Sequence, residues 1–316
     1  MRCVITGGAG FLGSHLSDLI LQQDHEVLVL DALITGSRAN IAHLLSHPGF
    51  TFRECDVRHP LQVDGPVDIV FNLASPASPP VYSRRRVECL LINSLGVHHA
   101  ARLALDTGAR LVQASTSEVY GDPLHHPQVE TDWGNVNPVG ERSCYDEGKR
   151  YGEALLTALR LEEGLNSGIV RIFNTYGPRM HPYDGRVISG FIRQALTGEP
   201  LTVFGDGSQT RSFCYVSDLV RGLWLMGTSD HPGPVNLGNP QEHTILQMAH
   251  YIRALTGSES PIVHEPLPAD DPARRRPQIS RAKEVLGWEP VVGLEEGLQH
   301  VIDWQRRTLG ATKQPA

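Results

Sequence analysis

Cysteine is scarce and scattered in this chain, and no Cys-x-x-Cys pair occurs. The cysteines are Cys3, Cys55, Cys89, Cys144 and Cys214. Such spacing argues against a zinc site or a disulfide framework and favours free thiols in a reducing compartment. The 15 histidines show no metal-ligand spacing either. The sequence therefore predicts no metal site.

Long apolar runs and an excess of positive charge are also lacking. No stretch is long enough to cross a bilayer, and a glycine-rich segment begins at residue 7, which leaves no room for a signal peptide before it. The formal net charge of −7 argues against nucleic acid or an anionic membrane as a partner. We therefore expect a cytoplasmic protein that binds neither. Its 316 residues allow one large domain or two ordinary ones.

Glycine, by contrast, is concentrated near the N-terminus, between a strand expected at 3–6 and a helix expected at about 11–23. The segment from Gly8 to Gly13 reads Gly-Ala-Gly-Phe-Leu-Gly, a G-x-G-x-x-G pattern. Glycines let the backbone turn tightly and let a pyrophosphate approach the amino end of the helix. The strand before the motif and the helix after it provide the context that such a pattern requires. We therefore predict a dinucleotide site.

A carboxylate follows at the end of the next expected strand, 26–30. Asp31 lies there, roughly 20 residues beyond the glycines, where a dinucleotide fold places an acceptor for the ribose hydroxyls. A carboxylate would repel a 2′-phosphate, so NAD is favoured over NADP. Arg38 lies close in sequence and weakens that preference.

Strands and helices alternate through the first half of the chain. Strands are expected at 51–55, 67–74, 111–114 and 169–173, and helices at 87–106 and 145–163. This alternation predicts a Rossmann-type, doubly wound parallel sheet that binds ligands at the carboxyl ends of its strands. The predicted cofactor-binding residues are Gly7, Gly10, Phe11, Leu12, Gly13, Asp31, Thr35, Gly36, Asp56, Val57, Leu73, Ala74, Tyr145 and Lys149.

Beyond residue 174 the elements become shorter, and glycine and proline separate them. Helices are expected at 187–196, 216–226, 244–255, 280–286 and 294–306, and the tail 310–316 is expected to fray. We predict an NAD-binding domain over 1–175 and a smaller C-terminal α/β substrate-binding domain over 176–316. The segment of about 207–240 is expected to return to the first domain.

Four kinds of reactive side chain are expected to meet at the sheet edge. Thr116, Ser117 and Glu118 follow a buried strand, while Tyr145 and Lys149 lie four residues apart on one face of the next helix. A hydroxyl, a carboxylate, a phenol and an ammonium can thus converge. A tyrosine and a lysine four residues apart occur by chance in many chains, so the pair gains meaning only from its surroundings.

These surroundings resemble the extended short-chain dehydrogenase/reductase enzymes that act on nucleotide sugars and, among them, the UDP-glucuronate decarboxylases (UDP-xylose synthases). The Tyr-x-x-x-Lys pair marks only the superfamily. The proline-rich segment and the Cys-Tyr-Asp-Glu-Gly-Lys string are much narrower signals. The resemblance covers nearly the whole chain and is carried by segments 72–80, 115–122, 126–128, 133–138, 142–150, 171–180, 184–187, 205–213 and 270–272.

The resemblance implies an NAD-dependent decarboxylation with no net redox change. Tyr145 would remove the proton of the sugar 4-hydroxyl while NAD takes the C4 hydride. Lys149 would favour the phenolate, and Thr116 would orient the same sugar oxygen. The resulting 4-ketone makes the C6 carboxylate a β-keto acid, which loses CO₂ easily, and the hydride then returns to C4.

Three further residues are implied at the carboxylate end of the sugar. Ser117 and Glu118 would place the carboxylate and a water, and Arg275 would act near the carboxylate and the protonation of C5. The implied substrate-binding residues are Pro79, Tyr82, Glu118, Asn174, Arg179, Val187, Gln209, Arg211 and Arg275. Relatives commonly pair through helices beside the sheet, so a homodimer is expected.

Other activities stay open at this point. A 4,6-dehydratase carries Thr-Asp-Glu where this chain has Thr116-Ser117-Glu118, and a 4-epimerase usually lacks equivalents of Glu118 and Arg275. Combined apiose and xylose formation is a sibling activity. A non-catalytic NAD-sensing regulator typically lacks the Tyr-Lys pair. Gly190, where relatives often carry Asn, and the basic segment 83–91 depart from the family pattern.

Overall fold

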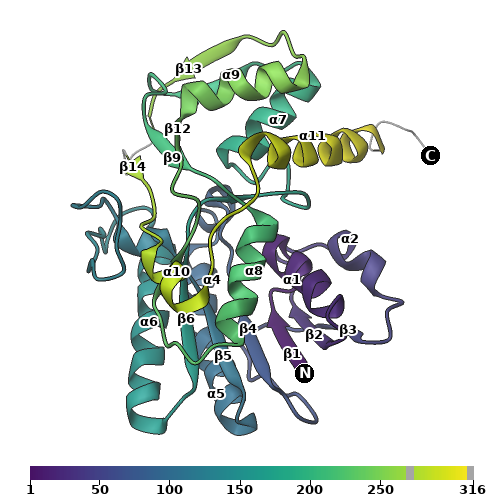
Figure 1. The fold of residues 1–316 in the computed structure, drawn as a ribbon, viewed down its shortest axis with the longest axis vertical. Coiled ribbons are helices and arrows are strands. Elements are labelled where there is room, and N and C mark those ends of the chain that lie inside the picture. Colours follow the sequence, from purple (N-terminus) through teal and green to yellow (C-terminus); the bar gives the residue numbers. More distant parts are fainter. Residues whose placement is uncertain (268–273, 312–316) are drawn as a thin grey trace.

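The computed structural model describes residues 1–267 and 274–311. The family segment 270–272 and the end of the tail, 312–316, lie outside the described residues. Two lobes stand one above the other in Figure 1: a lower lobe built on the large sheet and an upper lobe of short strands and helices. None of the helices in the described part of the chain is long and apolar enough to cross a membrane.

The lower lobe contains a seven-stranded sheet in the order β11-β6-β5-β4-β1-β2-β3, with every neighbouring pair parallel. This confirms the predicted doubly wound Rossmann-type fold. Its strands are β1 (Arg2–Thr6), β2 (Glu26–Asp31), β3 (Phe50–Glu54), β4 (Ile69–Asn72), β5 (Arg110–Thr116), β6 (Ser167–Ile172) and β11 (Val235–Leu237).

Apolar side chains cover both faces of this sheet, as a parallel sheet between helices requires. Neighbouring strand residues point to opposite faces, so Ile5 joins one buried cluster with Leu16 and Leu219, while Val4 joins the other with Leu103 and Leu156. The flanking helices are α1 (Phe11–Leu21), α5 (Val97–Thr107), α6 (Ser143–Glu163) and α8 (Val216–Gly227).

The upper lobe has its own apolar cluster, which includes Phe191, Met248 and Ile302. Its strands are β8 (Leu201–Phe204), β9 (Thr210–Ser212), β12 (Glu242–Thr244), β13 (Ile262–Glu265) and β14 (Arg274–Arg275), and its helices are α7 (Val187–Thr197), α9 (Ile245–Thr256) and α11 (Leu294–Ala311). The strands β7 (Thr175–Tyr176) and β10 (Cys214–Tyr215) pair with each other, and α10 (Ser280–Leu286) lies near β11.

The expected helix 87–106 is interrupted. It divides into α4 (Arg86–Leu91), a π turn (Ile92–Gly96) and α5. Within the turn the Asn93 amide donates to the Cys89 carbonyl at 3.0 Å. A short helix α3 (Pro79–Tyr82) precedes it, and α2 (Arg38–Ile41) with a 3-10 turn (Ala42–Leu44) follows β2. Helices this short lack the periodicity that reveals longer ones in a sequence.

Candidate active site

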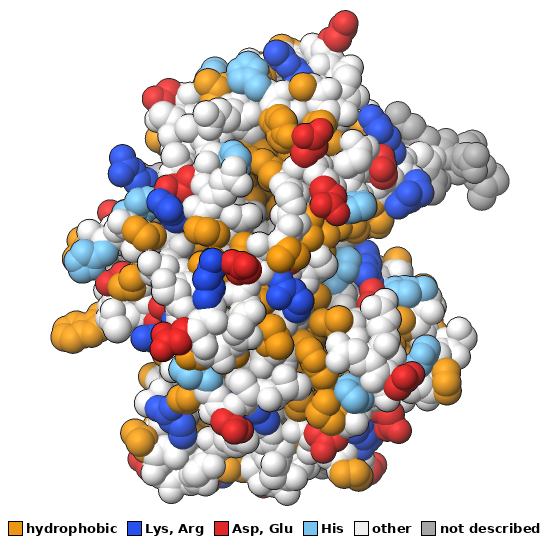
Figure 2. Space-filling view, viewed as in Figure 1, with side chains coloured by type: hydrophobic (Ala, Val, Ile, Leu, Met, Phe, Trp, Pro, Cys, Tyr) orange, Lys and Arg blue, Asp and Glu red, His pale blue; other side chains and the backbone are white. Residues whose placement is uncertain are grey.

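A cavity of about 640 Å³ lies between the lobes, and its lining extends from the loop after β1 to Leu309 of α11. The space-filling view is hollowed at this level, between α11 above and α1 and α2 below (Figure 2). Every residue predicted for the site lines the cavity except Gln209. Gln209 instead donates from its amide to the carbonyl of Phe204 at 2.8 Å.

The glycine segment forms a cradle that side chains would fill. Gly7 has a left-handed φ of +70°, and a Cβ on it would lie 2.8 Å from the backbone of Ala74 at the end of β4. A Cβ on Gly13 would lie 2.5 Å from the carbonyl oxygen of Gly7. Glycine is therefore required at both positions. The cradle leads to the amino end of α1, whose N–H groups suit a pyrophosphate.

Asp31 lies beside this cradle and is nearly buried. Its carboxylate accepts from the backbone N–H of Ala9 at 2.9 Å and of Leu33 at 2.8 Å. Burial raises the pKa of this carboxyl, against the lowering effect of those amides. Arg38 does not contact it: its guanidinium pairs with Glu54 at 2.9 Å and lies over the Phe52 ring. The residues present thus fit NAD, and Arg38 is turned away from the place where a 2′-phosphate would lie at Asp31.

The phenol of Tyr145 and the ammonium of Lys149 lie together in the cavity wall. Lys149 Nζ is 5.7 Å from the centre of the Tyr145 ring and donates to the Ala114 carbonyl at 2.8 Å. Burial raises the pKa of Tyr145, while a hydrogen bond with Thr116 and the charge of Arg186 lower it. Burial lowers the pKa of Lys149 to about 8. The ring of Tyr82 stacks on Tyr145, with centroids 5.3 Å apart.

Two arginines bind the carboxylate of Glu118, which lines the same cavity as Tyr145 and Lys149. Its Oε2 accepts from Arg142 at 2.5 Å and from Arg275 at 3.3 Å. Burial would raise the pKa of this carboxyl, but the charges of Arg275 and Arg142 outweigh burial and hold the pKa below its usual value. Thr116 Oγ1 accepts from the Glu118 N–H at 3.2 Å and caps the 3-10 turn Ser117–Tyr120. Glu118 is therefore an anion held by two guanidinium groups, on a backbone fixed by Thr116.

Arg275 contacts Ser117 and Glu118 although it lies 157 or more positions away in the sequence. Its side chain is 2% exposed and donates to the carbonyls of Ser117 at 2.5 Å and Gly121 at 3.2 Å. It lies in β14, which pairs with β9. A solvated charged loop, the ordinary expectation for a run of three arginines, does not describe this residue.

Two arginines of the cavity lining were missing from the predicted site, although both lie in the quoted family segments. Arg142 precedes Tyr145 by three residues, so helical spacing alone places it on the same face. Arg186 pairs with Asp184 at 2.9 Å, and its charge lowers the pKa of both Tyr145 and Glu118. No periodic pattern marks it, because the segment before α7 is irregular.

The remaining predicted substrate residues come from several elements. Asn174 follows β6, Val187 begins α7, Pro79 begins α3, and Arg211 lies in β9. Arg179 also lines the cavity and contacts α1 and α2 of the lower lobe. Its guanidinium binds Asp18 and also contacts the Asn40 carbonyl at 3.3 Å.

Fold, cradle and Tyr-Lys pair together define an NAD-dependent enzyme of the epimerase and dehydratase type. Residues 3–238 match the model of the NAD dependent epimerase/dehydratase family. UDP-glucuronic acid decarboxylase 1 of Danio rerio is 53% identical over 98% of this chain and 73% of that protein. UDP-glucuronic acid decarboxylase 6 of Arabidopsis thaliana is 50% identical over 99% of this chain and 91% of that protein. The chain belongs to the UDP-glucuronic acid decarboxylases within that larger family.

Among solved structures, a UDP-glucuronic acid 4-epimerase from Bacillus cereus, in complex with UDP-glucuronic acid and NAD, is similar. It is 26% identical, with a TM-score of 0.86 over 98% of this chain and 100% of that one. This similarity shows that the chain shares its architecture with an enzyme named for a different reaction, 4-epimerisation.

Proposed function

We propose that this chain is an NAD-dependent carboxy-lyase that converts UDP-glucuronate into UDP-xylose and CO₂ through a 4-keto intermediate. The observation that carries this proposal is the partly buried Glu118, fixed between Arg142 and Arg275 in the same cavity as Tyr145. Oxidation of a sugar hydroxyl requires only the Tyr-Lys pair and the cofactor. An anion flanked by arginines suits the additional handling of a carboxylate and a proton.

The glycine cradle and Asp31 would hold NAD, which when bound supplies a hydride acceptor that is restored by the end of the cycle. Tyr145 removes the proton from the sugar 4-hydroxyl, and Thr116 orients that oxygen. A phenol ordinarily has a pKa near ~10, and burial raises that of Tyr145 further. Lys149 and Arg186 therefore supply the positive charge that favours the phenolate. A decrease of three units corresponds to about 4 kcal/mol.

Decarboxylation follows from the position of the new ketone. Once C4 is a carbonyl, the C6 carboxylate is that of a β-keto acid, and the electrons of the breaking C5–C6 bond flow toward the C4 oxygen. Arg275 orients the carboxylate and stabilises charge. Ser117 and Glu118 place the water that returns a proton to C5. Return of the hydride to C4 then completes the pentose.

An NMR-monitored reaction of UDP-glucuronate with the purified, NAD-loaded protein tests this function. UDP-xylose and CO₂ are expected without consumption of added NADH. Formation of UDP-galacturonate would indicate an epimerase, and UDP-apiose would indicate the sibling synthase. Protein that leaves UDP-glucuronate untouched yet interconverts UDP-glucose and UDP-galactose would overturn the proposal.

The residue assignments and the domain division are part of the same proposal. Residues 1–175 would bind NAD and 176–316 the nucleotide sugar, with 207–240 returning to the lower lobe. In support, β11 pairs with β6, and α8 packs beside α1. The cysteines are free thiols, which supports the proposed cytoplasmic location.

We further propose a symmetric homodimer formed by α4 and α6. Apolar side chains stand exposed on the outside of these helices: Val87 and Leu91 on α4, Leu95 on the π turn that follows it, and Tyr151 on α6. The two helices pack against each other, so these side chains belong to one surface. A second copy related by a two-fold axis would cover that surface with its own equivalent.

Val87→Arg should therefore halve the molar mass measured by light scattering. The Val87 side chain is 73% exposed in one chain, so the charge would oppose association without disturbing the fold. Val291→Arg is a matched control, since Val291 is 72% exposed elsewhere on the molecule. A Val87→Arg protein that keeps its dimeric mass would refute this interface.

A further inference from the structure

Gln128 belongs to the His-Pro-Gln segment of the family pattern, and the mechanism above gives it no role. Its side chain is fully buried. Both main-chain polar groups of Arg276 bind to it: the Arg276 N–H donates to Gln128 Oε1 at 2.8 Å, and the Arg276 carbonyl accepts from the Gln128 N–H at 2.9 Å. Gln128 thus holds the residue next to Arg275 from two sides.

Main-chain bonds also fix the backbone on either side of Arg275: residues 128 and 277 form a parallel bridge, in which the Gln278 N–H donates to the Gln128 carbonyl at 2.9 Å. The Gln128 side chain adds the bond to the Arg276 N–H, the residue directly after Arg275. Strand β14 comprises only two residues, and its pairing with β9 places Arg275 opposite Arg211. The Ser212 hydroxyl adds a bond of 3.3 Å to the Arg275 carbonyl. Because the guanidinium of Arg275 must reach Ser117 and Glu118, a shift of about 1 Å in its backbone would spoil that geometry.

The main-chain carbonyl of Gln128 is connected, through Asn236 and Tyr120, to the 3-10 turn Ser117–Tyr120. Asn236 Nδ2 donates to the Gln128 carbonyl at 3.1 Å, and the Tyr120 hydroxyl donates to Asn236 Oδ1 at 2.7 Å. Tyr120 ends the 3-10 turn that contains Ser117 and Glu118. A chain of contacts therefore runs from the turn of Glu118 through Tyr120, Asn236 and Gln128 to the backbone beside Arg275. It forms a closed loop, because the Arg275 guanidinium binds Glu118.

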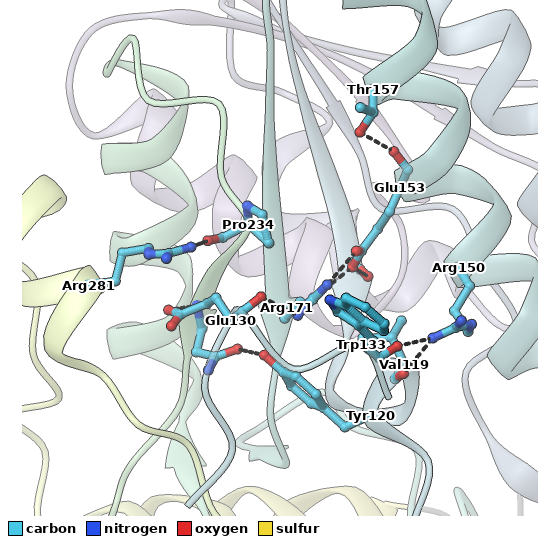
Figure 3. Close-up of polar contacts among 12 residues, drawn as sticks. Val119, Tyr120, Glu130, Trp133, Arg150, Glu153, Thr157, Arg171, Pro234 and Arg281 are labelled. Atoms are coloured by element: carbon cyan, nitrogen blue, oxygen red, sulfur yellow. Dashed lines mark hydrogen bonds and ion pairs between the residues drawn. The ribbon is translucent and has the colours of Figure 1, made fainter. Parts of the chain in front are cut away.

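Charged residues support the Tyr120 end of this chain of contacts: Figure 3 shows Arg171 beside Tyr120, between Glu130 and Glu153. Arg171 lies with its guanidinium 4.8 Å from the centre of the Tyr120 ring and donates to the Glu130 carbonyl at 3.1 Å. Glu130 in turn accepts from the Asn236 N–H at 2.9 Å. Arg171 also binds both carboxylate oxygens of Glu153 on α6, the helix of Tyr145. Arg171 thus connects this chain of contacts to α6.

We propose that Gln128 is a positioning residue that sets where Arg275 lies relative to Glu118, and so governs recognition of the carboxylate at C6 of the sugar. This role rests on the proposed function. Gln128 touches no substrate atom; it acts by holding the main chain of Arg276. The consequence is selective, because only the C6 end of the sugar depends on Arg275.

Gln128→Met removes the side-chain bonds at similar length and tests the role. In the NAD-loaded Tyr145→Phe background, where turnover is blocked, calorimetry should show about tenfold weaker binding of UDP-glucuronate, the scale of one lost buried hydrogen bond. Binding of UDP-glucose, which differs only at C6, should stay unchanged. In the otherwise unaltered enzyme, kcat should fall by about tenfold or more.

Two variants keep the test decisive. Gln128→Glu keeps an acceptor for the Arg276 N–H and should retain more of the preference for UDP-glucuronate than Gln128→Met. Gln305→Met removes another fully buried glutamine, which donates to the Ser189 carbonyl at 3.3 Å, and should leave the preference intact. Equal losses for both sugars, or no loss, would overturn the role of Gln128. An unmutated enzyme that fails to decarboxylate would instead reject the proposed function.

Discussion

Tyr145→Phe is expected to lower kcat by roughly 10²- to 10⁴-fold, the range supplied by a general base, while NAD remains bound. The substitution removes only the hydroxyl, so the ring still stacks on Tyr82. The cradle that would hold the cofactor lies at the ends of β1 and β4, away from the lost oxygen. The measurement is single-turnover formation of UDP-xylose, with bound NAD determined after gel filtration.

Tyr251→Phe is a suitable comparison for that experiment, because the Tyr251 hydroxyl binds Glu295 on the surface of the upper lobe at 3.0 Å. It should have full activity. If Tyr145→Phe were as active as this control, another group would have to accept the proton, and the assignment of Tyr145 would be wrong.

Glu118→Gln is expected to reduce decarboxylation by about 10²- to 10³-fold, comparable with the loss of a preorganised charge at other active sites. The amide keeps the shape but removes the anion between Arg142 and Arg275. Two guanidiniums then face each other in a largely buried site, and breaking a buried pair in this way costs about 3–5 kcal/mol of stability. Kinetics and thermal unfolding measured on the same preparation would give both effects.

The stability difference has a defined pH dependence. The pKa of Glu118 is lower in the folded protein than its ordinary value near ~4.3. Its contribution is therefore present above that value and disappears as the pH falls through the lowered pKa. Glu199→Gln, which affects a surface pair with Arg193, is the control for substitution of a carboxylate. Unchanged decarboxylation in Glu118→Gln would make Glu118 structural.

The parts of the site that follow strand periodicity could be predicted from the sequence. A parallel sheet brings its strand ends to one edge, so Gly7, Asp31, Ala74 and Thr116 had to lie close together once the alternation of elements was recognised. Helical spacing likewise paired Tyr145 with Lys149. Local geometry was sufficient in each case.

Long-range contacts in irregular segments could not be predicted in this way. Arg275 binds the Ser117 carbonyl because β14 pairs with β9 over two residues, too short a strand to leave a pattern. Arg186 lies in an equally irregular segment before α7. Gln209 occupies a family segment, yet it turns toward Phe204 and away from the cavity. Only tertiary structure determines these directions.

Arg179 joins the two lobes at one edge of the cavity. It has a left-handed φ of +66°, a conformation that costs a non-glycine residue about 1–2 kcal/mol. From there its guanidinium binds Asp18 and the Asn40 carbonyl, and the Asn40 amide donates to the glycine segment at Ala9. A catalyst that restores its own oxidant in every cycle has no need to exchange it. We therefore expect these contacts to slow the escape of the dinucleotide without hindering the exchange of sugars.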